Sequence, residues 1–542
     1  MSSSARMRSA LAWVKPWRAT LTMLTLVGLC ACGSTAPPAS PPDPAPASAH
    51  PAGDPPGDPP ALTVSRVNID SAHPGAAVPA RFIGLSFEAS TLDHFAQFGQ
   101  DGDLATLLRS LGPGLIRFGG ISADTRTAFV DPLSARPAWA GWTVNAQTFR
   151  GVAELARRSG WRVLLTVGLA HYDPIVAARE VAAAHSALGS YLAAVEIGNE
   201  PDSYAEHGLR GSSWGVGQYL GQLAAYRRAI GRITPGVSIV APDVSGSRAF
   251  QRWALPVAAA ARPALLTGHH YPLGCQDAPA PSIGLLLSPA VRKAEGLSLD
   301  RYQSLAAATG IRFRLDETGS VSCGGAPGIS DTFASALWAL DISVRAMTTG
   351  ISGLNFEGNV QHCDTYTPVC ARTPARLRSG TLSPQPEWYA LLLTRFLVGD
   401  RPLAVHVSPA RPDIDVAALL SRGGAVHLVV VDDAPAGADV TDLHVSVGTR
   451  FARAQILTLA APSVSALTGV TLGGAAVRAN GSWTAPRRLP VVRARGGTIS
   501  ITVRPTTGTL VTLTPPGVSP RRPDQPRSGR RTRPGSRSGA AG

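Results

Sequence analysis

Eight short apolar runs, each followed by a segment of helical spacing, limit the fold of this sequence more than any other feature. The runs end in polar or glycine residues and occupy positions 81–88, 114–120, 162–169, 193–199, 237–242, 265–271, 311–317 and 351–358. Continuous apolar runs of this length indicate strands that are buried on both faces. Eight such strands alternating with helices predict a parallel (β/α)₈ TIM barrel, in which functional residues lie at the carboxyl ends of the strands.

The sequence changes character after about residue 395. Segments such as VHLVVVDD and TISITVRP alternate Val, Thr and Leu with polar residues and are separated by Gly, Pro and Asp. This pattern predicts an antiparallel β-sandwich. We therefore expect an α/β catalytic barrel over 62–394 and a C-terminal β-domain over 395–515. Residues 62–80 precede the first barrel strand and are assigned either to the barrel or to the β-domain.

The first 31 residues have the pattern of an export signal. A basic stretch through Arg18 precedes an apolar run at 19–29, which is shorter than the roughly 20 residues that a permanent membrane helix needs. Leu29-Cys30-Ala31-Cys32 resembles the bacterial lipobox, which implies a diacylglyceryl group on Cys32. We expect a cell-envelope lipoprotein that is anchored to a membrane outside the cytoplasm, or a secreted protein if the lipobox is not used.

Both ends of the chain lack a composition that can bury a core. Residues 32–61 are almost entirely Pro, Ala, Ser, Asp and Gly and are predicted to form a tether, and residues 516–542 are predicted to be a disordered basic tail. The formal charge of +14 is concentrated in the first 31 residues and in this tail. The body of the chain therefore lacks the charge expected of a nucleic-acid binder.

Four cysteines remain when Cys30 and Cys32 are set aside, which is an even number in an exported protein and predicts disulfides. Cys363 and Cys370 are close enough in sequence to close one loop, and Cys275 would then pair with Cys323. Four cysteines allow three connectivities, so this pairing is a preference. No Cys-x-x-Cys spacing or nearby histidine cluster favours the alternative of a zinc site.

Two glutamates close predicted strands on opposite sides of the barrel. Glu200 follows the fourth strand within Asn199-Glu200-Pro201, and Glu317 ends the seventh strand. Hydrolysis of a glycosidic bond with retention needs one carboxylic acid to protonate the leaving oxygen and one carboxylate to attack the anomeric carbon. Each glutamate alone is also typical of a helix start or a loop, so the argument depends on the pair.

Several ordered motifs resemble those of glycoside hydrolase family 79, which contains β-glucuronidases and heparanases. The motifs are IRFGGISAD at 116–124, VEIGNEPDS at 195–203, GHHYP at 268–272 and ETGSVSCGGAPGISDTFASALWALD at 317–341, and the resemblance spans residues 80–512. It implies that Glu200 is the general acid/base and Glu317 the nucleophile. It also implies that Asn199 hydrogen-bonds the sugar 2-hydroxyl, a contact that strengthens as positive charge develops on the ring.

Other residues at the strand ends are candidate site residues. Tyr271 matches a family tyrosine whose hydroxyl keeps the nucleophile ionised. Arg117 either supports the nucleophile by its charge or satisfies buried carbonyl groups. Glu88 and Asp124 either bind sugar hydroxyls or cap the ends of their strands.

Tyr366 lies between Cys363 and Cys370 and loosely matches a family tyrosine near the uronate. His269 and His270 are expected to be supporting or barrel-filling residues.

The chain departs from the family where the substrate carboxylate is bound. Family members commonly have Tyr-Gly-Gly at this point, whereas this chain has Ser322-Cys323-Gly324. A serine still offers a hydroxyl, but cysteine adds a Cβ where an amide nest favours glycine. A Cys275–Cys323 bridge would rebuild the floor of this pocket.

Three functions follow from these observations. The first is a retaining hydrolase of β-linked glucuronides or related glycans, and the second is a β-glycosidase for neutral sugars. The third is a non-catalytic carbohydrate-binding lipoprotein of the cell envelope. The sequence contains no nucleotide-binding glycine fingerprint and no metal-ligand spacing, and glycoside hydrolysis needs no cofactor. The expected partners are a glycoside or polysaccharide substrate and a membrane, and no nucleic acid.

Overall fold

The computed structural model describes residues 62–133, 135–478 and 481–517. The predicted signal peptide, its Cys32, the tether and the basic tail from residue 518 onward lie outside these ranges. In the described part of the chain, no helix is long and apolar enough to cross a membrane.

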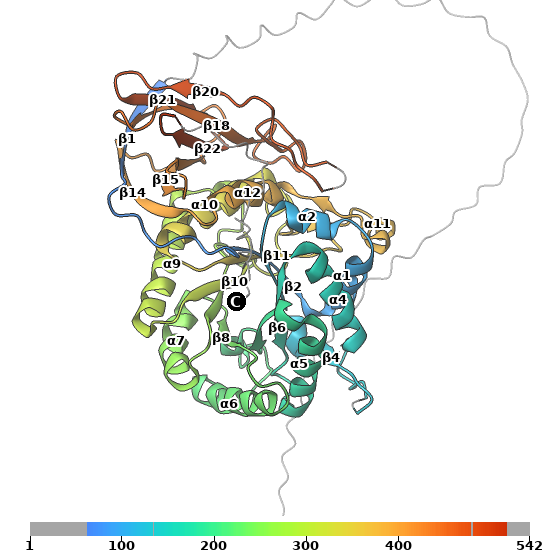
Figure 1. Cartoon of the computed structure of the whole chain (residues 1–542). Coiled ribbons are helices and arrows are strands. Elements are labelled where there is room, and N and C mark those ends of the chain that lie inside the picture. The colour runs from blue at the N-terminus through green and yellow to red at the C-terminus, as the bar shows by residue number, and fades with distance from the viewer. Residues whose placement is uncertain (1–61, 134, 479–480, 518–542) are drawn as a thin grey trace, which may run out of the picture. The chain divides into compact units, whose positions relative to one another are not determined.

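Eight parallel strands close into a barrel in the order β10-β11-β2-β3-β6-β7-β8-β9 (Figure 1). These strands are β2 (Ile83–Glu88), β3 (Leu115–Gly119), β6 (Arg162–Val167), β7 (Leu192–Ile197), β8 (Ile239–Val244), β9 (Leu266–His270), β10 (Phe313–Thr318) and β11 (Leu354–Gly358). Each overlaps one of the eight apolar runs, and most of their residues are buried. The predicted TIM barrel is therefore confirmed.

Helices follow the strands and surround the barrel. They are α1 (Leu92–Gln100), α2 (Leu104–Ser110), α3 (Ile121–Thr125), α4 (Ala146–Ser159), α5 (Pro174–Leu188), α6 (Val216–Ile233), α7 (Ser247–Ala261), α8 (Ile283–Leu286), α9 (Pro289–Thr309), α10 (Phe333–Thr349), α11 (Pro374–Ser379) and α12 (Pro386–Thr394). Single 3₁₀ turns are η1 (Ala89–Thr91), η2 (Gly189–Tyr191), η3 (Pro201–Ser203) and η4 (Arg395–Leu397). Two short strand pairs, β4 (Thr127–Phe129) with β5 (Trp142–Val144) and β12 (Val369–Cys370) with β13 (Ser383–Pro384), lie in the loops.

Local sequence sets the ends of these helices, as α4 illustrates. The Asn145 side chain accepts hydrogen bonds from the backbone of the first turn, and the Thr148 hydroxyl oxygen accepts one from the Asn145 N–H. This capping box satisfies N–H groups that the helix itself leaves unpaired. Gly160 ends the helix with φ +78°, a left-handed conformation that glycine adopts without strain.

The remaining strands form a ten-stranded sheet with the order β19-β18-β22-β16-β15-β14-β1-β17-β21, in which β20 pairs with β18. They are β1 (Leu62–Asp70), β14 (Arg401–Ser408), β15 (Ile414–Leu420), β16 (Val426–Asp432), β17 (Val440–Ser446), β18 (Arg453–Ala460), β19 (Thr471–Leu472), β20 (Val491–Arg493), β21 (Thr498–Val503) and β22 (Thr507–Thr514). The two ends of this sheet enclose one core, to which β1, β17 and β21 contribute from one side and β16, β18 and β22 from the other. The β-domain predicted from the sequence is therefore present as a second layered structure.

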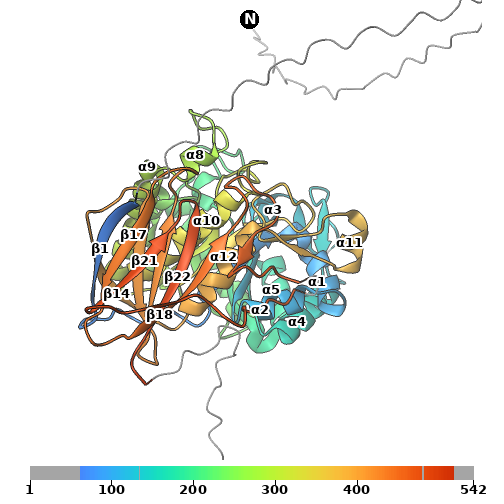
Figure 2. The same cartoon turned by 90° about the horizontal axis from the view of Figure 1, so that it is seen from above.

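Strand β1 places the start of the described chain in the β-domain. It pairs antiparallel with β14 and parallel with β17. Of the two assignments left open for residues 62–80, residues 62–70 therefore follow the one that places them in the β-domain. Helices α10 and α12 lie beneath the sheet (Figure 2), and α10 contacts strands β14, β15, β16 and β22. Because α10 packs against these strands on one side and against helices α9 and α12, nearly all of its side chains are buried.

Two disulfides join the four predicted cysteines. Cys275 is bonded to Cys323, and Cys363 is bonded to Cys370. Both bridges lie in loops on the carboxyl side of the barrel strands, after β9, β10 and β11. The preferred connectivity is therefore confirmed.

Candidate active site

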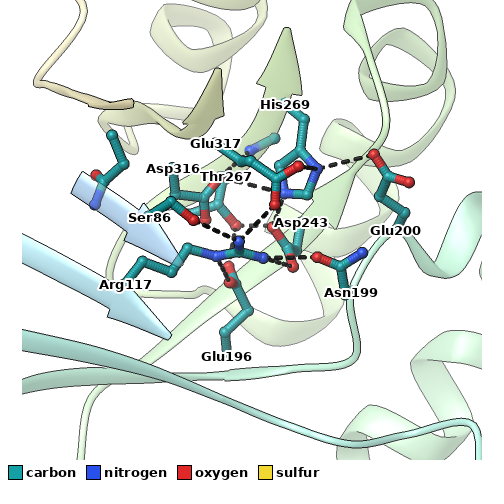
Figure 3. A network of polar contacts seen from close by, with 12 residues as sticks. Ser86, Arg117, Glu196, Asn199, Glu200, Asp243, Thr267, His269, Asp316 and Glu317 are labelled. Atoms are coloured by element: carbon teal, nitrogen blue, oxygen red, sulfur yellow. Dashed lines mark hydrogen bonds and ion pairs between the residues drawn. The ribbon is translucent and has the colours of Figure 1, made fainter. Parts of the chain in front are cut away.

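The two predicted catalytic glutamates meet at the mouth of the barrel. Glu200 follows β7 and Glu317 lies in β10, and a carboxylate oxygen of each lies within 4.8 Å of the other (Figure 3). Retaining glycosidases have carboxyl groups about 5 to 5.5 Å apart, whereas inverting enzymes need roughly 6.5 to 9.5 Å to admit a water molecule. The observed separation fits the retaining arrangement.

The backbone at Glu200 adopts a left-handed conformation. Its φ is 47° and its ψ is 52°, which is uncommon for a residue with a side chain and costs on the order of 1–3 kcal/mol. The Glu200 N–H donates to the carbonyl of Asp243 at 2.9 Å, and Pro201 starts η3. This turn directs the Glu200 carboxylate to His269, whose Nδ1 lies 2.9 Å from Oε1. About a fifth of the Glu200 side chain is exposed (21%), so it can reach a bound ligand.

Glu317 is held by three groups. Arg117 Nη1 donates to Oε2 at 2.8 Å, the Tyr271 hydroxyl donates to Oε1 at 2.8 Å, and His269 Nδ1 lies 3.6 Å from Oε1. Burial alone would raise the pKa of this carboxyl. The charges of His269 and Arg117, together with the hydrogen bonds, outweigh burial and lower the pKa of Glu317 below its usual value of 4.5. These contacts thus favour the ionised form of Glu317.

Arg117 lies at the centre of this network and has no solvent exposure. All its donor nitrogens are used, at distances of 2.8–3.1 Å, by Glu196, Ser86, Glu317, Asn199 and Asp243. A planar guanidinium can hold several acceptors in fixed directions, which an ammonium cannot do. Arg117 therefore supports Glu317 directly. The alternative, in which Arg117 only satisfies buried carbonyl groups of the backbone, is wrong because all five of its acceptors are side-chain oxygens.

Three further acids surround Arg117 below the glutamates. Burial raises the pKa of Glu196 to about 7 and also raises the pKa values of Asp243 and Asp316. The neighbouring Glu196 raises the pKa of Asp316 further. The charge of Arg117 opposes this rise in all three acids.

His269 bridges the two glutamates, a position that sequence reasoning did not assign to it. Its Nε2 lies 2.6 Å from Asp243 Oδ1, while Nδ1 lies between the Glu200 and Glu317 carboxylates. Burial acts to lower the pKa of the imidazole, but Glu317 and Asp243 raise it well above its usual value. The carboxylates at its two nitrogens therefore favour the imidazolium form, which can donate from both nitrogens. The adjacent His270 points to the other face of β9 and contacts Glu295 at 3.2 Å.

Two groups of side chains have donor atoms close enough together to consider a metal. They are Glu200 with His269 and Glu317, and Asp243 with His269 and Asp316. Both groups share His269, and each of its nitrogens already lies at hydrogen-bond distance from a carboxylate. A charged imidazolium has no lone pair for a metal. The donor set therefore fits a proton network better than a metal site.

Asn199 and Asp124 lie beside this network. The Asn199 Oδ1 accepts from Arg117 at 2.9 Å, which leaves its NH₂ group available to a ligand. Asp124 lies in α3 and is 1% exposed, and its oxygens accept from the backbone N–H groups of Asn199, Leu169 and Ala170 and from the Tyr204 hydroxyl. Asp124 therefore positions the loops after β6 and β7. Of the two roles that the sequence left open for Asp124, these contacts favour capping over a contact with the sugar.

Glu88 and Glu357 add two acids to the wall of the site beside Glu317. Glu88 ends β2 and accepts from the Ser122 N–H at 2.9 Å, so it has the capping role that the sequence allowed, while part of its surface stays exposed. Glu357 lies in β11, and its buried Oε2 has no hydrogen-bond partner among the described residues. Burial, and then the charges of Glu317 and Glu88, raise the pKa of Glu357 well above its usual value. Sequence reasoning missed Glu357 although it closes the eighth strand.

The Ser322–Gly325 segment contains three successive residues with positive φ, Cys323, Gly324 and Gly325. Cys323 has φ +59° although it carries a Cβ, which shows that this position favours glycine. The Ser322 hydroxyl accepts from the Cys275 N–H at 3.2 Å, and the Gly324 N–H donates to the Tyr366 hydroxyl at 3.1 Å. The Tyr366 ring lies 5.8 Å from that of Tyr271. The structure thus brings both disulfide-bonded loops to the side of Glu317.

No family model matches the chain. A β-glucuronidase from Neurospora crassa is 24% identical over 277 residues, which are 47% of this chain and 46% of that protein, so the match spans less than half of the curated relative.

Solved structures share the fold over most of the chain. A 4-O-α-L-rhamnosyl-β-D-glucuronidase from Fusarium oxysporum, solved as a Rha-GlcA complex, has a TM-score of 0.67 and 19% identity and covers 83% of this chain and 100% of that one. A GH51 arabinofuranosidase from Xanthomonas axonopodis pv. citri has a TM-score of 0.61 and 14% identity and covers 83% of this chain and 99% of that one. At these identities, the likeness establishes the fold.

Proposed function

We propose that this protein is a retaining glycoside hydrolase in which Glu317 is the nucleophile and Glu200 the general acid/base. The observation that carries the proposal is the distance of at most 4.8 Å between oxygens of the two carboxylates at the ends of β7 and β10. The lowered pKa of Glu317 supports its role, because a nucleophile must be ionised at the pH of the reaction.

The proposed reaction has two steps. In the first, a Glu317 oxygen attacks the anomeric carbon while Glu200 donates its proton to the leaving oxygen, so the glycosidic bond breaks and a glycosyl ester forms on Glu317. In the second, Glu200 takes a proton from water, and the water oxygen attacks the same carbon and releases Glu317. Two inversions at one carbon give net retention. Asn199 is proposed to hold the 2-hydroxyl, where a hydrogen bond strengthens as charge develops on the ring.

The proposed substrates are β-linked glucuronides or related glycans, and we propose that the chain is a member of glycoside hydrolase family 79. The names of the Neurospora crassa relative and of the Fusarium oxysporum structure support this choice. The hydrogen bond between Gly324 and Tyr366 supports a pocket at the position where the resemblance implies carboxylate binding.

A specific observation favours neutral sugars as a second candidate substrate class. The Ser322 hydroxyl is turned to the Cys275 N–H, away from the role that a tyrosine hydroxyl has in the family pattern. Glu88 and Glu357 also add acidic groups beside Glu317, and these oppose an anionic sugar whenever they are ionised.

The test of the proposed function is turnover of 4-nitrophenyl β-glucuronide, β-glucoside, β-xyloside and β-galactoside by wild-type protein and by the Glu317→Gln variant. Wild-type turnover that Glu317→Gln abolishes supports a hydrolase, and the best substrate names the sugar. Proton NMR of the first-formed product then distinguishes retention from inversion. A product of inverted configuration, or equal turnover by the variant, rejects the proposed mechanism.

We further propose that the protein is exported and anchored through a lipid on Cys32. The Leu-x-Ala-Cys sequence before residue 33 supports this location. Metabolic labelling with a radioactive fatty acid in a bacterial host, followed by fractionation, tests it. The wild-type chain should carry label and sediment with membranes, whereas the Cys32→Ser variant should carry none; unlabelled wild-type protein in the medium would contradict the anchor.

A further inference from the structure

Exposed aromatic side chains gather on the loops that follow the second and third barrel strands. Trp139, Trp142 and Tyr172 are 37%, 46% and 49% exposed. Within residues 62–133, 135–478 and 481–517, no other Trp, Tyr or Phe reaches that exposure. Scattered single apolar residues are normal on a surface, but a cluster of aromatic rings marks a contact with a ligand or partner.

Two of these rings line a cavity of about 630 Å³. Trp139 belongs to the loop after β3, and Tyr172 to the loop after β6. The exposed side chains of Leu133 and Ile175 complete an apolar wall, with Phe129 deeper in the cavity. A concave site of this size, lined by aromatic and aliphatic groups, suits a ligand with apolar faces.

The walls of the cavity are fixed. The Trp139 ring stacks on the His171 ring with their centroids 3.8 Å apart and their planes 9° apart. Arg179 donates to Asp131 at 2.9 Å and ties the helix after β6 to the loop after β3. A platform held in place before binding loses little conformational freedom when a ligand arrives.

Three acidic residues, Asp124, Asp173 and Glu180, line this cavity. Glu180 lines it, and burial raises the pKa of Glu180 to about 8. Its side chain makes no hydrogen bond or ion pair to the described residues. A carboxylic acid that is neutral at pH 7 both donates and accepts a hydrogen bond, as a sugar hydroxyl requires, and it does not demand a cationic partner.

The cavity adjoins the catalytic centre through Asp124. This residue lines the cavity, and its Oδ2 accepts from the backbone N–H of Asn199 at 2.7 Å, the residue immediately before Glu200. Both loops of the cavity leave the carboxyl ends of barrel strands, as the loop of Glu200 does. The cavity therefore lies at the same end of the barrel as Glu200.

We propose that the cavity is an outer sugar subsite that binds one pyranose ring of an oligosaccharide, at least one residue away from the bond that is cleaved. This inference rests on the proposed function. The C–H groups of a pyranose face carry partial positive charge and stack on the negative face of an indole or phenol, while the hydroxyls at the ring edge meet Glu180. The Trp139 and Tyr172 side chains supply the stacking surface, and Glu180 supplies the polar contact.

The test measures binding without turnover. Glu317→Gln protein is titrated by calorimetry with hexasaccharides prepared from glucuronoxylan, hyaluronan and arabinogalactan. For the hexasaccharide that binds, adding Trp139→Ala should weaken affinity by about ten-fold or more, because a lost aromatic contact of about 1.4 kcal/mol corresponds to that factor. Tyr172→Ala removes a more exposed ring and provides a second test that does not depend on the folding of Trp139→Ala.

Trp142→Ala is the matched control. This tryptophan is 46% exposed, close to the 49% of Tyr172, but it does not line the cavity, and the guanidinium of Arg126 lies 5.8 Å from the centre of its ring. Its replacement should leave hexasaccharide affinity within about two-fold, since surface substitutions away from a contact have small effects. Unchanged affinity in both Trp139→Ala and Tyr172→Ala overturns the subsite. Loss of binding to phosphatidylglycerol vesicles in those variants, with sugar affinity unchanged, would make the cluster a membrane contact and also overturn it.

Wild-type turnover of 4-nitrophenyl glycosides, measured in parallel, separates the two proposals. Turnover without binding of any hexasaccharide to Glu317→Gln protein overturns the subsite and leaves the proposed function standing. Hexasaccharide binding that depends on Trp139, in a protein that turns over no glycoside, supports a sugar site at the cavity and rejects the proposed function.

Discussion

Arg117 donates from Nη1 to Glu317 at 2.8 Å and from Nη2 to Asn199 at 2.9 Å. One buried cation thus sets the spacing between the proposed nucleophile and the proposed contact to the sugar 2-hydroxyl. Because one rigid plane holds both acceptors, the geometry of the site depends on the planar shape of the guanidinium as well as on its charge.

Replacing Arg117 by Lys should therefore lower kcat/KM by roughly 100-fold, the order found when one preorganised stabilising group is removed. A lysine keeps the charge but cannot reach five acceptors. The free energy of unfolding should also fall, by about 3–5 kcal/mol, because buried carboxylates lose partners. Steady-state kinetics and urea unfolding measure the two effects.

Arg314→Lys is the control for Arg117→Lys. Arg314 is also buried in the barrel, but it donates to Asn355 and to the carbonyl of Arg81 near the start of the strands. Its replacement should reduce stability while kcat/KM stays within about three-fold. Equal losses of kcat/KM in the two variants would show that activity follows stability alone.

Tyr271→Phe should move the acid limb of the pH profile of kcat/KM to higher pH. The Tyr271 hydroxyl donates to Glu317 Oε1, and this hydrogen bond helps to lower the pKa of Glu317. Without it the pKa rises, so a larger fraction of Glu317 is protonated at a given acidic pH. Tyr219→Phe is the control, since the Tyr219 hydroxyl has no hydrogen-bond partner among the described residues. An acid limb that stays in place in Tyr271→Phe would contradict this role.

The stabilising contribution of His269 should be lost at alkaline pH. Its pKa in the folded protein is raised well above the usual 6.5, so the stability it contributes is present below 6.5 and is lost as pH rises through the raised value. His269→Gln should lower the free energy of unfolding near pH 7 and flatten its decline toward alkaline pH. Denaturant unfolding over this pH range measures both; parallel curves for wild type and variant would contradict a charged His269.

The contribution of Glu317 to the free energy of unfolding should be lost at acidic pH, the opposite of the behaviour expected for His269. The pKa of Glu317 in the folded protein is below the usual 4.5, so its contribution to stability is present above 4.5 and is lost as pH falls through the lowered value. Glu317→Gln should therefore remove part of the acid-side decrease in unfolding free energy. A decrease that is as steep in the variant as in the wild type would contradict the lowered pKa.

The two disulfides should differ in their effect on stability. Cys275–Cys323 closes 48 residues and Cys363–Cys370 closes 7. Loop-closure entropy then gives about 4 kcal/mol for the longer loop and about 2 kcal/mol for the shorter one. Replacing both members of each pair by serine and measuring the free energy of unfolding checks this order. The reverse order would indicate that native contacts of the short loop outweigh the entropy of the long one.

The eight apolar runs and the positions of Glu200 and Glu317 were predictable because barrel strands are buried on both faces and end at one rim. Arg117 was also found as a candidate, since it lies in one of these strands, and Tyr271 was found through the family resemblance. The disulfide pairing followed from sequence spacing.

The roles of His269, Glu357 and Asp124 were not predictable in the same way. Of two adjacent histidines on β9, only the register of the barrel decides that His269 faces the glutamates and His270 the helices. Glu357 becomes part of the site because β11 pairs with β2, next to Glu88. The choice between the two roles of Asp124 depends on α3, which turns its carboxylate toward the loops after β6 and β7, and this requires knowledge of the chain path after β3.

The central claim is that Glu317 forms a covalent bond to the sugar. The most direct measurement is intact-mass spectrometry and peptide mapping after incubation with the 2-deoxy-2-fluoro aryl glycoside of the sugar that wild-type protein cleaves best. We predict one added fluoroglycosyl group per chain, mapped to Glu317, and none in the Glu317→Gln variant. A label on Glu200 or Glu357, or inactivation without any label, would contradict the account.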